Sequence, residues 1–478
     1  MKKLLSILLI VLLFPFSYIT NETTAAVNGL PKNVVIGYWE NWGKEGQNKI
    51  KLRDCDRGWD VVIVSFMLTD ETNYRCVFSP VDYIYGSNVA TAEAEFLSDV
   101  KFLQSRGQKV LIAFGGAVSY NLDLRTTANR DEFYRTARDI IEKYDFDGWD
   151  IDIEQSILAN KPAWGDYATT CIDKTNETSM LNPTKPTNVN LIWICKELEK
   201  YFGDDFMLTM APEHPYVQGG AFYWGGSAGI WGGYLPLING VRDILDFVHV
   251  QLYNNGYGDY PDGYNIANVE SYVNLTKLLI EGFTTGQTMW QPGVSEYFAG
   301  LRPDQVALGV LVQNTGGSGT LTNAEYAECL RQLLAVYPDF RGIMTWSINW
   351  TVYNKTDFLP LMRSIIDELP VETTTTVSIL IPTMTIATTT STATTPILTT
   401  ISAPPIENNI GDIDLDNQVG KIADVVLLGK HVASKISLTG QSFINANCDM
   451  RDPAVNVADL QALIKYMLKQ ISELPFKG

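Results

Sequence analysis

Three acidic side chains recur at every second position of one short segment. Asp150, Asp152 and Glu154 alternate with Ile151 and Ile153. Alternate residues of a β-strand point to one face, about 6–7 Å apart. Three neighbouring carboxylates that face a protein interior can coexist only if they share protons and their pKa values are pushed apart. A carboxylic acid that stays protonated near neutral pH is what general acid catalysis requires, so the segment predicts an acid catalyst.

Short apolar runs and amphipathic stretches alternate through the first 370 residues and would supply the frame for this segment. The strand-like runs are Val34–Trp39, Val61–Phe66, Val110–Phe114, Gly148–Ile153, Phe206–Ala211, Phe247–Tyr253, Val306–Val312 and Gly342–Ile348. Several are apolar at nearly every position, as expected of strands buried on both faces. The helix-like segments between them include Ala92–Arg106, Arg130–Tyr144, Val189–Phe202 and Ala324–Tyr337.

Eight strands that alternate with helices in about 340 residues predict an α/β fold, a (β/α)8 barrel. A doubly wound sheet is the alternative. The acidic segment taken alone could also be the polar outer face of an edge strand, but the seven other strands favour a buried position. In a barrel the chemistry lies at the carboxyl ends of the strands, where Glu154 falls.

The acidic segment also resembles a known family signature. Asp147, Asp150, Asp152 and Glu154 occupy the four acidic positions of the DxxDxDxE motif of glycoside hydrolase family 18. The segment 113–116 reads Ala-Phe-Gly-Gly and is similar to the SxGG segment of that family, with alanine in place of serine. This departure removes a hydroxyl near the acidic cluster and leaves every catalytic group in place.

The resemblance covers residues 33–368 and implies a chitinase, which hydrolyses β-1,4 bonds between N-acetylglucosamine units with retention of configuration. In this family the acetamido group of the substrate attacks the anomeric carbon, an exception to the scheme with two catalytic carboxylates. Glu154 would protonate the leaving oxygen. Asp152 and Tyr253 would stabilise the oxazolinium ion, and Asp150 would exchange a proton with Asp152. No cofactor is implied for this reaction.

The resemblance also implies a sugar pocket at the ends of the strands. Its expected substrate-binding residues are Tyr38, Phe66, Met210, Gln251, Asn254 and Trp346. Met210, Tyr253 and Trp346 have a structural alternative, because each could be a packed core side chain.

Two other functions share this motif or fold. An endo-β-N-acetylglucosaminidase that acts on N-glycans has the same acidic signature. A non-catalytic sugar-binding protein on the same barrel is the second alternative, but such proteins usually lose the final acid, which is Glu154 here. His214, His249 and His431 are the only histidines, and no GxSxG or HExxH motif accompanies them. A serine hydrolase or zinc hydrolase is therefore not predicted, and His249 is expected to be a core histidine.

Composition narrows the class of protein further. The chain has 478 residues, is 46% hydrophobic and carries a formal net charge of −18. This apolar content is sufficient for a large core and excludes a disordered protein. The negative charge argues against a nucleic-acid partner, whose phosphates favour basic proteins. A neutral polymer, a metal ion or a protein partner fits better.

The segment 1–26 has the composition of a signal peptide. Lys2 and Lys3 supply positive charge, residues 4–16 are apolar, and Ala26 is a small residue suited to cleavage. About 13 apolar residues are too few to span a bilayer, which needs about 20, and no later segment is apolar enough. We therefore expect a secreted, extracellular protein without a membrane span.

Export permits disulfides. The six cysteines are Cys55, Cys76, Cys171, Cys195, Cys329 and Cys448. Cys55 and Cys76 are close enough in sequence to form a disulfide between loops, and so are Cys171 and Cys195. Free buried thiols are the alternative. No CxxC pair suggests zinc.

A run of Thr, Ile, Ala and Pro with almost no charge occupies residues 371–406 and predicts an exposed linker. It divides a large domain, 27–370, from a small one, 407–478. Two Asp-rich loops in the small domain each lead into an apolar helical pattern, and hard cations take several carboxylate oxygens, so the loops predict calcium sites. The candidate ligands are Asp412, Asp414, Asp416, Asp424, Asp449, Asp452, Asn456 and Asp459.

The two loops resemble a type I dockerin, a small all-α module that binds cohesin-bearing scaffold proteins. This resemblance implies docking into a multi-enzyme complex of the cellulosome type. Both loops depart from the dockerin pattern, because Asp424 falls one residue late and the spacing from Asp449 to Asp452 is one residue short. A small acidic helical hairpin without metal is the alternative.

Overall fold

The computed structural model divides the chain into two compact units, Met1–Ser378 and Ile379–Gly478. It describes residues 29–43, 48–80, 84–117, 122–154, 179–224, 231–254, 260–261, 263–264, 268–286, 295–312 and 317–368, together with Leu428 and Leu463. Leu428 and Leu463 belong to the second unit, and each is helical and buried. The predicted signal peptide, the linker and all eight candidate calcium ligands lie outside the described residues.

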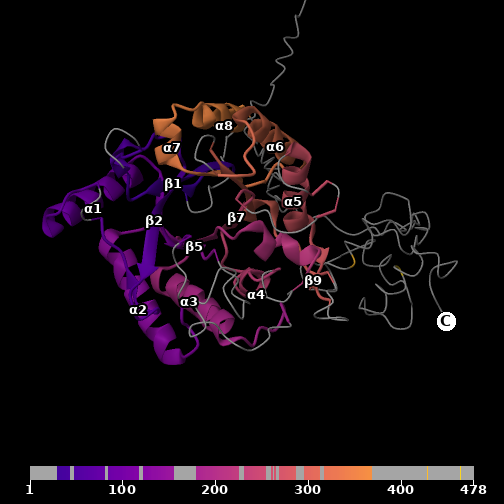
Figure 1. Ribbon diagram of the computed structural model, residues 1–478, viewed down its shortest axis with the longest axis horizontal. Coiled ribbons are helices and arrows are strands. Elements are labelled where there is room, and N and C mark those ends of the chain that lie inside the picture. The colour runs from indigo at the N-terminus through magenta and orange to yellow at the C-terminus, as the bar shows by residue number, and fades with distance from the viewer. Residues whose placement is uncertain are drawn as a thin grey trace, which may run out of the picture. The chain divides into compact units, whose positions relative to one another are not determined.

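Eight parallel strands close into a barrel (Figure 1). They are β1 (Val34–Glu40), β2 (Val61–Thr69), β4 (Lys109–Gly115), β5 (Gly148–Asp152), β6 (Met207–Met210), β7 (Phe247–Gln251), β10 (Val306–Leu311) and β11 (Gly342–Trp346). Each strand pairs with its neighbour around the ring, and β1 pairs with both β2 and β11. This closure confirms the predicted barrel and all eight strand-like runs, and it excludes the doubly wound alternative.

Helices follow most of the strands and surround them in Figure 1. They are α1 (Val89–Ser105), α2 (Thr127–Tyr144), α3 (Pro186–Phe202), α4 (Leu235–Gly240), α5 (Val269–Glu281), α6 (Asn323–Val336), α7 (Ile348–Tyr353) and α8 (Phe358–Asp367). The four predicted helices are confirmed, and each begins one to three residues earlier than its apolar pattern. Polar caps explain the difference for α1 and α2, because Asn88 and Thr126 accept hydrogen bonds from the first-turn amides.

Hydrophobic periodicity does not predict several short elements, because each contains only two to four residues. They are β3 (Cys76–Val77), β8 (Phe283–Thr284), β9 (Tyr297–Phe298), η2 (Leu52–Asp54), η3 (His214–Tyr216), η4 (Gln218–Ala221) and η5 (Pro303–Gln305). The first of these, β3, pairs antiparallel with the extension of β2 beyond the barrel.

Strand alternation divides the core into two layers. Val35 and Trp39 of β1 belong to a large cluster that also contains buried helix residues such as Phe96, so this cluster lies between strands and helices. Ile36 and Tyr38 belong to a second cluster made almost entirely of strand residues, which fills the barrel interior. The interior is therefore a packed core, as in other barrels of this size.

The four described cysteines, Cys55, Cys76, Cys195 and Cys329, are free and buried. Of the two possibilities left open by the sequence for Cys55 and Cys76, a disulfide or free buried thiols, the structure has the free thiols. Each thiol packs as a small apolar group, and burial raises its pKa. Among the described helices, none is long and apolar enough to cross a bilayer.

Candidate active site

The acidic face of β5 points into the barrel and up to its carboxyl end. Asp150 is fully buried, Asp152 is 2% exposed, and Glu154 lies two residues beyond the end of the strand and is half-buried. The predicted alternation is thus confirmed: the three carboxylates form a column that runs from the packed core to the surface of a cavity. Asp147 belongs to the other end of the strand, where its carboxylate accepts the Val110 amide at 2.8 Å.

Side chains from three other strands surround Asp150. The Tyr38 hydroxyl of β1 donates to Oδ2 at 2.5 Å, and the Thr209 hydroxyl of β6 donates to Oδ1 at 2.5 Å. His249 Nε2 of β7 lies 3.0 Å from the same Oδ1. Both carboxylate oxygens therefore have partners, although the side chain is shut off from water.

Asp152 is held by one amide side chain and has a raised pKa. Gln251 Nε2 donates to Asp152 Oδ1 at 2.8 Å and to the Ala211 carbonyl at 2.9 Å. Burial is the main cause of the raised pKa of Asp152, and the charges of Glu154, Asp150 and Glu213 add to it. Asp152 therefore favours the protonated form more strongly than an ordinary aspartic acid does.

Glu154 has the pKa of a working acid. Burial raises its pKa to about 7, while a hydrogen bond with Gln251 acts in the opposite direction. A carboxylic acid with this pKa can hold a proton near neutral pH and release it to a leaving group, which is the property that the sequence predicted.

Two tyrosines hold the backbone that presents Glu154. The Ile153 amide donates to the Tyr234 hydroxyl at 2.7 Å, and that hydroxyl donates to the Ile153 carbonyl at 2.8 Å. The Tyr216 hydroxyl donates to the Glu154 carbonyl at 3.2 Å. Both tyrosines come from the connection between β6 and α4. Glu154 is therefore fixed by its main chain even though it lies outside the strand.

The pair Gly115 and Gly116, at the end of β4, allows this segment to pack closely against β5. The Gly116 amide donates to the Asp152 carbonyl at 2.6 Å. A Cβ at Gly115 would lie 2.0 Å from that carbonyl oxygen, and φ is +124° there. A Cβ at Gly116 would lie 2.6 Å from the ring of Phe66. The glycines of the SxGG-like segment therefore serve close packing against the acidic strand.

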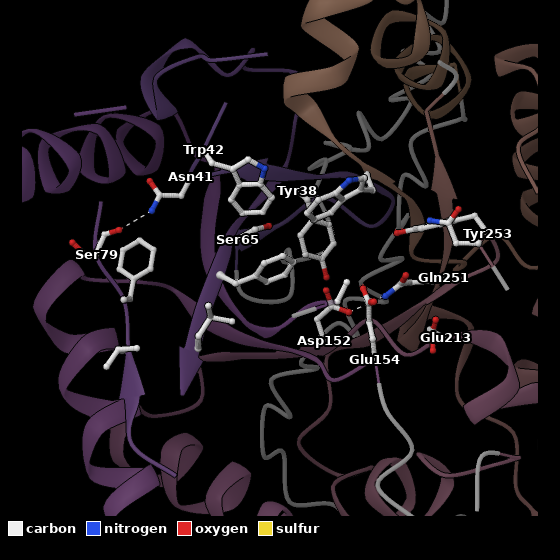
Figure 2. Close-up of a pocket in the computed structure, with 17 residues that line it drawn as sticks. Tyr38, Asn41, Trp42, Ser65, Ser79, Asp152, Glu154, Glu213, Gln251 and Tyr253 are labelled. Carbon is white, nitrogen blue, oxygen red and sulfur yellow. Dashed lines mark hydrogen bonds between the residues drawn. The ribbon is translucent and has the colours of Figure 1, made fainter. Parts of the chain in front are cut away.

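A cavity of about 790 Å³ opens above the column (Figure 2). Its lining residues are Tyr38, Asn41, Trp42, Ser65, Phe66, Leu68, Val77, Phe78, Ser79, Ala117, Asp152, Glu154, Glu213, Gln251, Tyr253, Asn254 and Trp346. The volume and the mixture of aromatic and polar side chains are typical of a pocket for a small ligand or for part of a polymer. The structure thus brings together all predicted pocket and catalytic residues except Met210 and Asp150.

Stacked aromatic rings form one side of the cavity. The rings of Phe66 and Trp346 are nearly parallel, with centroids 5.6 Å apart and an interplanar angle of 8°. Trp42 packs on both, at 5.9 Å from Phe66 and 6.1 Å from Trp346. Aromatic faces of this kind pack well against the apolar faces of sugar rings. Trp346 therefore lies at the cavity surface, and the alternative that it is a packed core side chain does not hold.

Two residues at the end of β7 complete the opposite side. Tyr253 lines the cavity but is largely buried, and its pKa is raised by burial first and then by the charges of Asp152 and Glu154. Asn254 lies in the left-handed region with φ of 59°, and its Oδ1 accepts the Ser318 amide at 2.9 Å. Asn254 therefore also holds the neighbouring loop, a structural role that the sequence did not indicate.

Met210 is the predicted pocket residue that the structure places elsewhere. It is fully buried in the layer between strands and helices, and it pairs with Ile151, which also faces outward. Because side chains alternate along β6, the neighbouring Thr209 and Ala211 face the barrel interior instead. The placement of Met210 against substrate is thus wrong, and its structural alternative is correct.

Several residues of the site were missed from the sequence. Thr209 and His249 contact Asp150, and Trp42 and Glu213 line the cavity. A signal existed for His249, because it precedes Gln251 by two residues and so shares its strand face. Within the described ranges, no group of three or more His, Cys, Asp or Glu side chains is arranged to hold a metal ion.

Comparisons with known proteins match the chain to one family of glycoside hydrolases. A family model described as "Glycosyl hydrolases family 18" matches residues 34–309. Chitinase Chi52 of Paenibacillus xylanexedens is 35% identical over 358 residues, which cover 71% of this chain and 62% of that protein. Chitinase D of Niallia circulans is 36% identical over 358 residues, with coverages of 71% and 63%. The chain thus spans less than two thirds of the length of these curated relatives.

A solved structure gives the same result. The crystal structure of a family GH18 chitinase from Chromobacterium violaceum has a TM-score of 0.58 and 30% sequence identity to this chain. The match covers 72% of this chain and 87% of that one. The residues matched by the family model, 34–309, run from the start of β1 into β10 and so lie in the barrel.

Proposed function

The chain belongs to glycosyl hydrolase family 18, and on this premise we propose that it is a chitinase, which cleaves β-1,4 bonds between N-acetylglucosamine units. The observation that carries the proposal is the column of Asp150, Asp152 and Glu154, whose outer members meet an aromatic-lined cavity. The names of the relatives support the substrate class, because both of those compared above are chitinases.

In the first step Glu154 is the acid. Its proton goes to the glycosidic oxygen as the bond from that oxygen to the anomeric carbon breaks. The acetamido carbonyl oxygen of the same sugar forms a bond to the anomeric carbon and gives an oxazolinium ion. A pKa near 7 suits this step, because the group is protonated before the reaction and gives up its proton readily.

Asp152 acts on the acetamido group. Its carboxyl lies at the cavity surface, next to Glu154 in the column, and Gln251 holds one of its oxygens. An Asp152 carboxylate would accept the acetamido N–H and stabilise the positive charge of the oxazolinium ion. The proton that Asp152 holds in the free enzyme would pass toward Asp150, whose carboxyl group is held in place by Tyr38 and Thr209.

In the second step a water molecule attacks the anomeric carbon and Glu154, now a carboxylate, takes its proton. The acetamido group is restored and the enzyme returns to its first state. Two inversions at the anomeric carbon give net retention, so the product first formed is the β anomer. Proton NMR of the earliest products of a chitin oligomer tests this step. An α anomer formed first would contradict the mechanism.

The substrate itself needs a direct test. An endo-β-N-acetylglucosaminidase that acts on N-glycans would use the same acidic column. We therefore propose to compare the products from N-acetylglucosamine oligomers with those from a high-mannose glycopeptide. Cleavage of the oligomers with the glycopeptide intact supports a chitinase, and the reverse result supports the alternative. An oligomer with a free amine in place of the acetamido group of the reacting sugar should not be cut at that position.

We also propose that the protein is secreted and that residues 407–478 form a calcium-dependent dockerin-like module. The two Asp-rich loops support this proposal. Calcium that binds only the folded loops stabilises them, so the full chain should show a melting transition that chelator shifts and calcium restores. Asp412→Ala should weaken this response and leave hydrolysis intact. Melting that is indifferent to calcium, or no binding to a cohesin, would contradict the dockerin proposal.

A further inference from the structure

Of the two strands that flank Asp150 in the sheet, one presents a hydroxyl group to it and the other does not. In the parallel sheet it pairs with Ala113 of β4 on one side and with Thr209 of β6 on the other. Both of these neighbours are buried in the barrel interior. The alanine offers no donor, whereas the Thr209 hydroxyl donates to Asp150 Oδ1 at 2.5 Å. The hydroxyl that the SxGG-like segment lacks on β4 is thus matched by a hydroxyl from the opposite neighbour.

His249 approaches the same oxygen from the next strand along. It is fully buried, its Nε2 lies 3.0 Å from Asp150 Oδ1, and its Nδ1 has no hydrogen-bond partner among the described residues. A doubly protonated ring would leave a buried N–H unpaired at Nδ1, which is costly. The neutral ring with its proton on Nε2 therefore fits best, and in that form His249 donates to Asp150.

Neither Thr209 nor His249 lines the cavity. Thr209 therefore reaches the cavity through Asp150, and His249 reaches it through Asp150 and through an edge contact with the Tyr38 ring, with centroids 5.8 Å apart. Together with the Tyr38 hydroxyl on Oδ2, they place three donors on one buried carboxylate. Donors on both oxygens fix the position and the plane of the carboxyl group. An Asp150 carboxyl held in one plane can exchange a proton with Asp152, whose own pKa is raised.

We propose that Thr209 and His249 are positioning residues that hold Asp150 as the proton partner of Asp152, in place of the hydroxyl that is absent at residue 113. This inference rests on the proposed function, because it assigns both residues to that reaction. It also explains why an alanine is tolerated at this point of the barrel. His249, expected to be only a core histidine, gains a part in the chemistry.

The test separates turnover from binding. Thr209→Val keeps the shape of the side chain and removes the hydroxyl, and His249→Leu removes the ring donor. Each should lower kcat about ten- to hundredfold on an N-acetylglucosamine oligomer, the loss expected from one hydrogen bond to a charged group. KM should change less than about twofold, because neither residue contacts the substrate. His249→Gln keeps an N–H donor and should lose less than His249→Leu.

Rescue and control variants make the test specific. Ala113→Ser places a hydroxyl beside Asp150 from the other neighbouring strand, so it should restore most of the kcat lost in Thr209→Val. Thr345→Val is the matched control, because Thr345 is a fully buried barrel threonine whose hydroxyl has no partner among the described residues. Its kcat should stay at the wild-type value.

Each outcome decides the inference. An unchanged kcat in Thr209→Val and His249→Leu, or a rise in KM without a fall in kcat, overturns it, as does a loss in Thr209→Val that Ala113→Ser fails to restore. If His249→Leu does not fold, the near-isosteric Thr209→Val with its rescue decides alone. A wild-type chain that leaves the oligomers uncut would overturn the proposed function first, whereas an active wild type with unaffected variants overturns only this inference.

Discussion

The two sides of the cavity differ in composition and in the way they are held. The acidic side, made of Asp152, Glu154 and Glu213, comes from the ends of β5 and β6. The aromatic side, made of Trp42, Phe66 and Trp346, comes from the ends of β1, β2 and β11, on the opposite arc of the ring. Figure 2 shows Trp42 and the labelled carboxylates on separate sides of the pocket.

The acidic side depends on hydrogen bonds and on burial, both of which set proton affinities. The aromatic side depends on ring stacking, which creates an apolar surface and leaves proton affinities unchanged. We therefore expect changes on the acidic side to act on turnover and changes on the aromatic side to act on substrate binding. The variants below can break this division of roles or make it sharper.

The largest effect is expected at Glu154. Glu154→Gln keeps the size of the side chain and removes the transferable proton, so kcat should fall by about 10²–10⁴ or more. Hydrolysis of an N-acetylglucosamine oligomer measures the loss, and KM should stay close to the wild-type value. Undiminished turnover in this variant would show that the acid lies elsewhere.

Asp152→Asn should follow, with a fall in kcat of about 10²–10³, because the oxazolinium ion loses its anionic partner. The variant keeps the contact geometry with Gln251 nearly unchanged, so a loss of turnover with normal melting would point to charge. An oligomer kinetic series at one pH is sufficient for the measurement. A variant that affects only KM would place Asp152 in binding instead.

The pH dependence should come from the same side of the cavity. Burial raises the pKa of Glu154 to about 7, so the acid is protonated below that pH and loses its proton above it. We expect kcat/KM to fall about tenfold for each pH unit above 7. An ordinary glutamic acid would instead lose its proton above pH 4.5. A pH–rate profile that already declines between pH 5 and 6 would contradict the raised pKa.

On the aromatic side, Trp346→Ala removes a ring that stacks on Phe66 and forms part of the cavity surface. Here KM should rise about tenfold, as expected for the loss of one aromatic contact, while kcat falls less. Trp346→Phe keeps a ring and serves as the matched control, with a smaller rise. A large fall in kcat with unchanged KM would break the division between the two sides.

The smallest effect on activity is expected at Glu40, a buried acid behind the aromatic side. Its carboxylate accepts hydrogen bonds from the hydroxyl of Ser347 and from Asn48 Nδ2, the latter at 3.2 Å. Burial raises its pKa to about 7, although the bond from Ser347 lowers it. Its stabilising contribution is therefore full below the unfolded pKa near 4.5 and is lost as pH rises through 7.

Glu40→Gln removes this dependence. Between pH 5 and 8 the unfolding free energy of the wild type should fall by about 2 kcal/mol more than that of the variant. Denaturant unfolding at the two pH values measures the difference. Because Glu40 does not line the cavity, kcat should stay within about twofold of wild type. Equal pH dependence in both chains would show that Glu40 is not a buried acid with a raised pKa.

Much of the barrel followed from the sequence because its signals are local. Each strand is one apolar run between turns, so all eight could be predicted without knowledge of their partners. The face shared by Asp150, Asp152 and Glu154 depends only on the two-residue period of a strand. The meeting of a hydroxyl, an imidazole and a carboxylate from different strands at one point depends on more than this local period.

Only the closed barrel decides which side chains meet. Thr209 lies 59 positions from Asp150 and His249 lies 99, and they reach it because strand register sets their height in the ring. The same register turns Met210 outward, although its motif suggested a pocket residue. The amino-acid sequence alone determines the composition and the period of each strand face. Register and closure are properties of pairs of strands, so only the tertiary structure decides the partners of Asp150 and the two sides of the cavity.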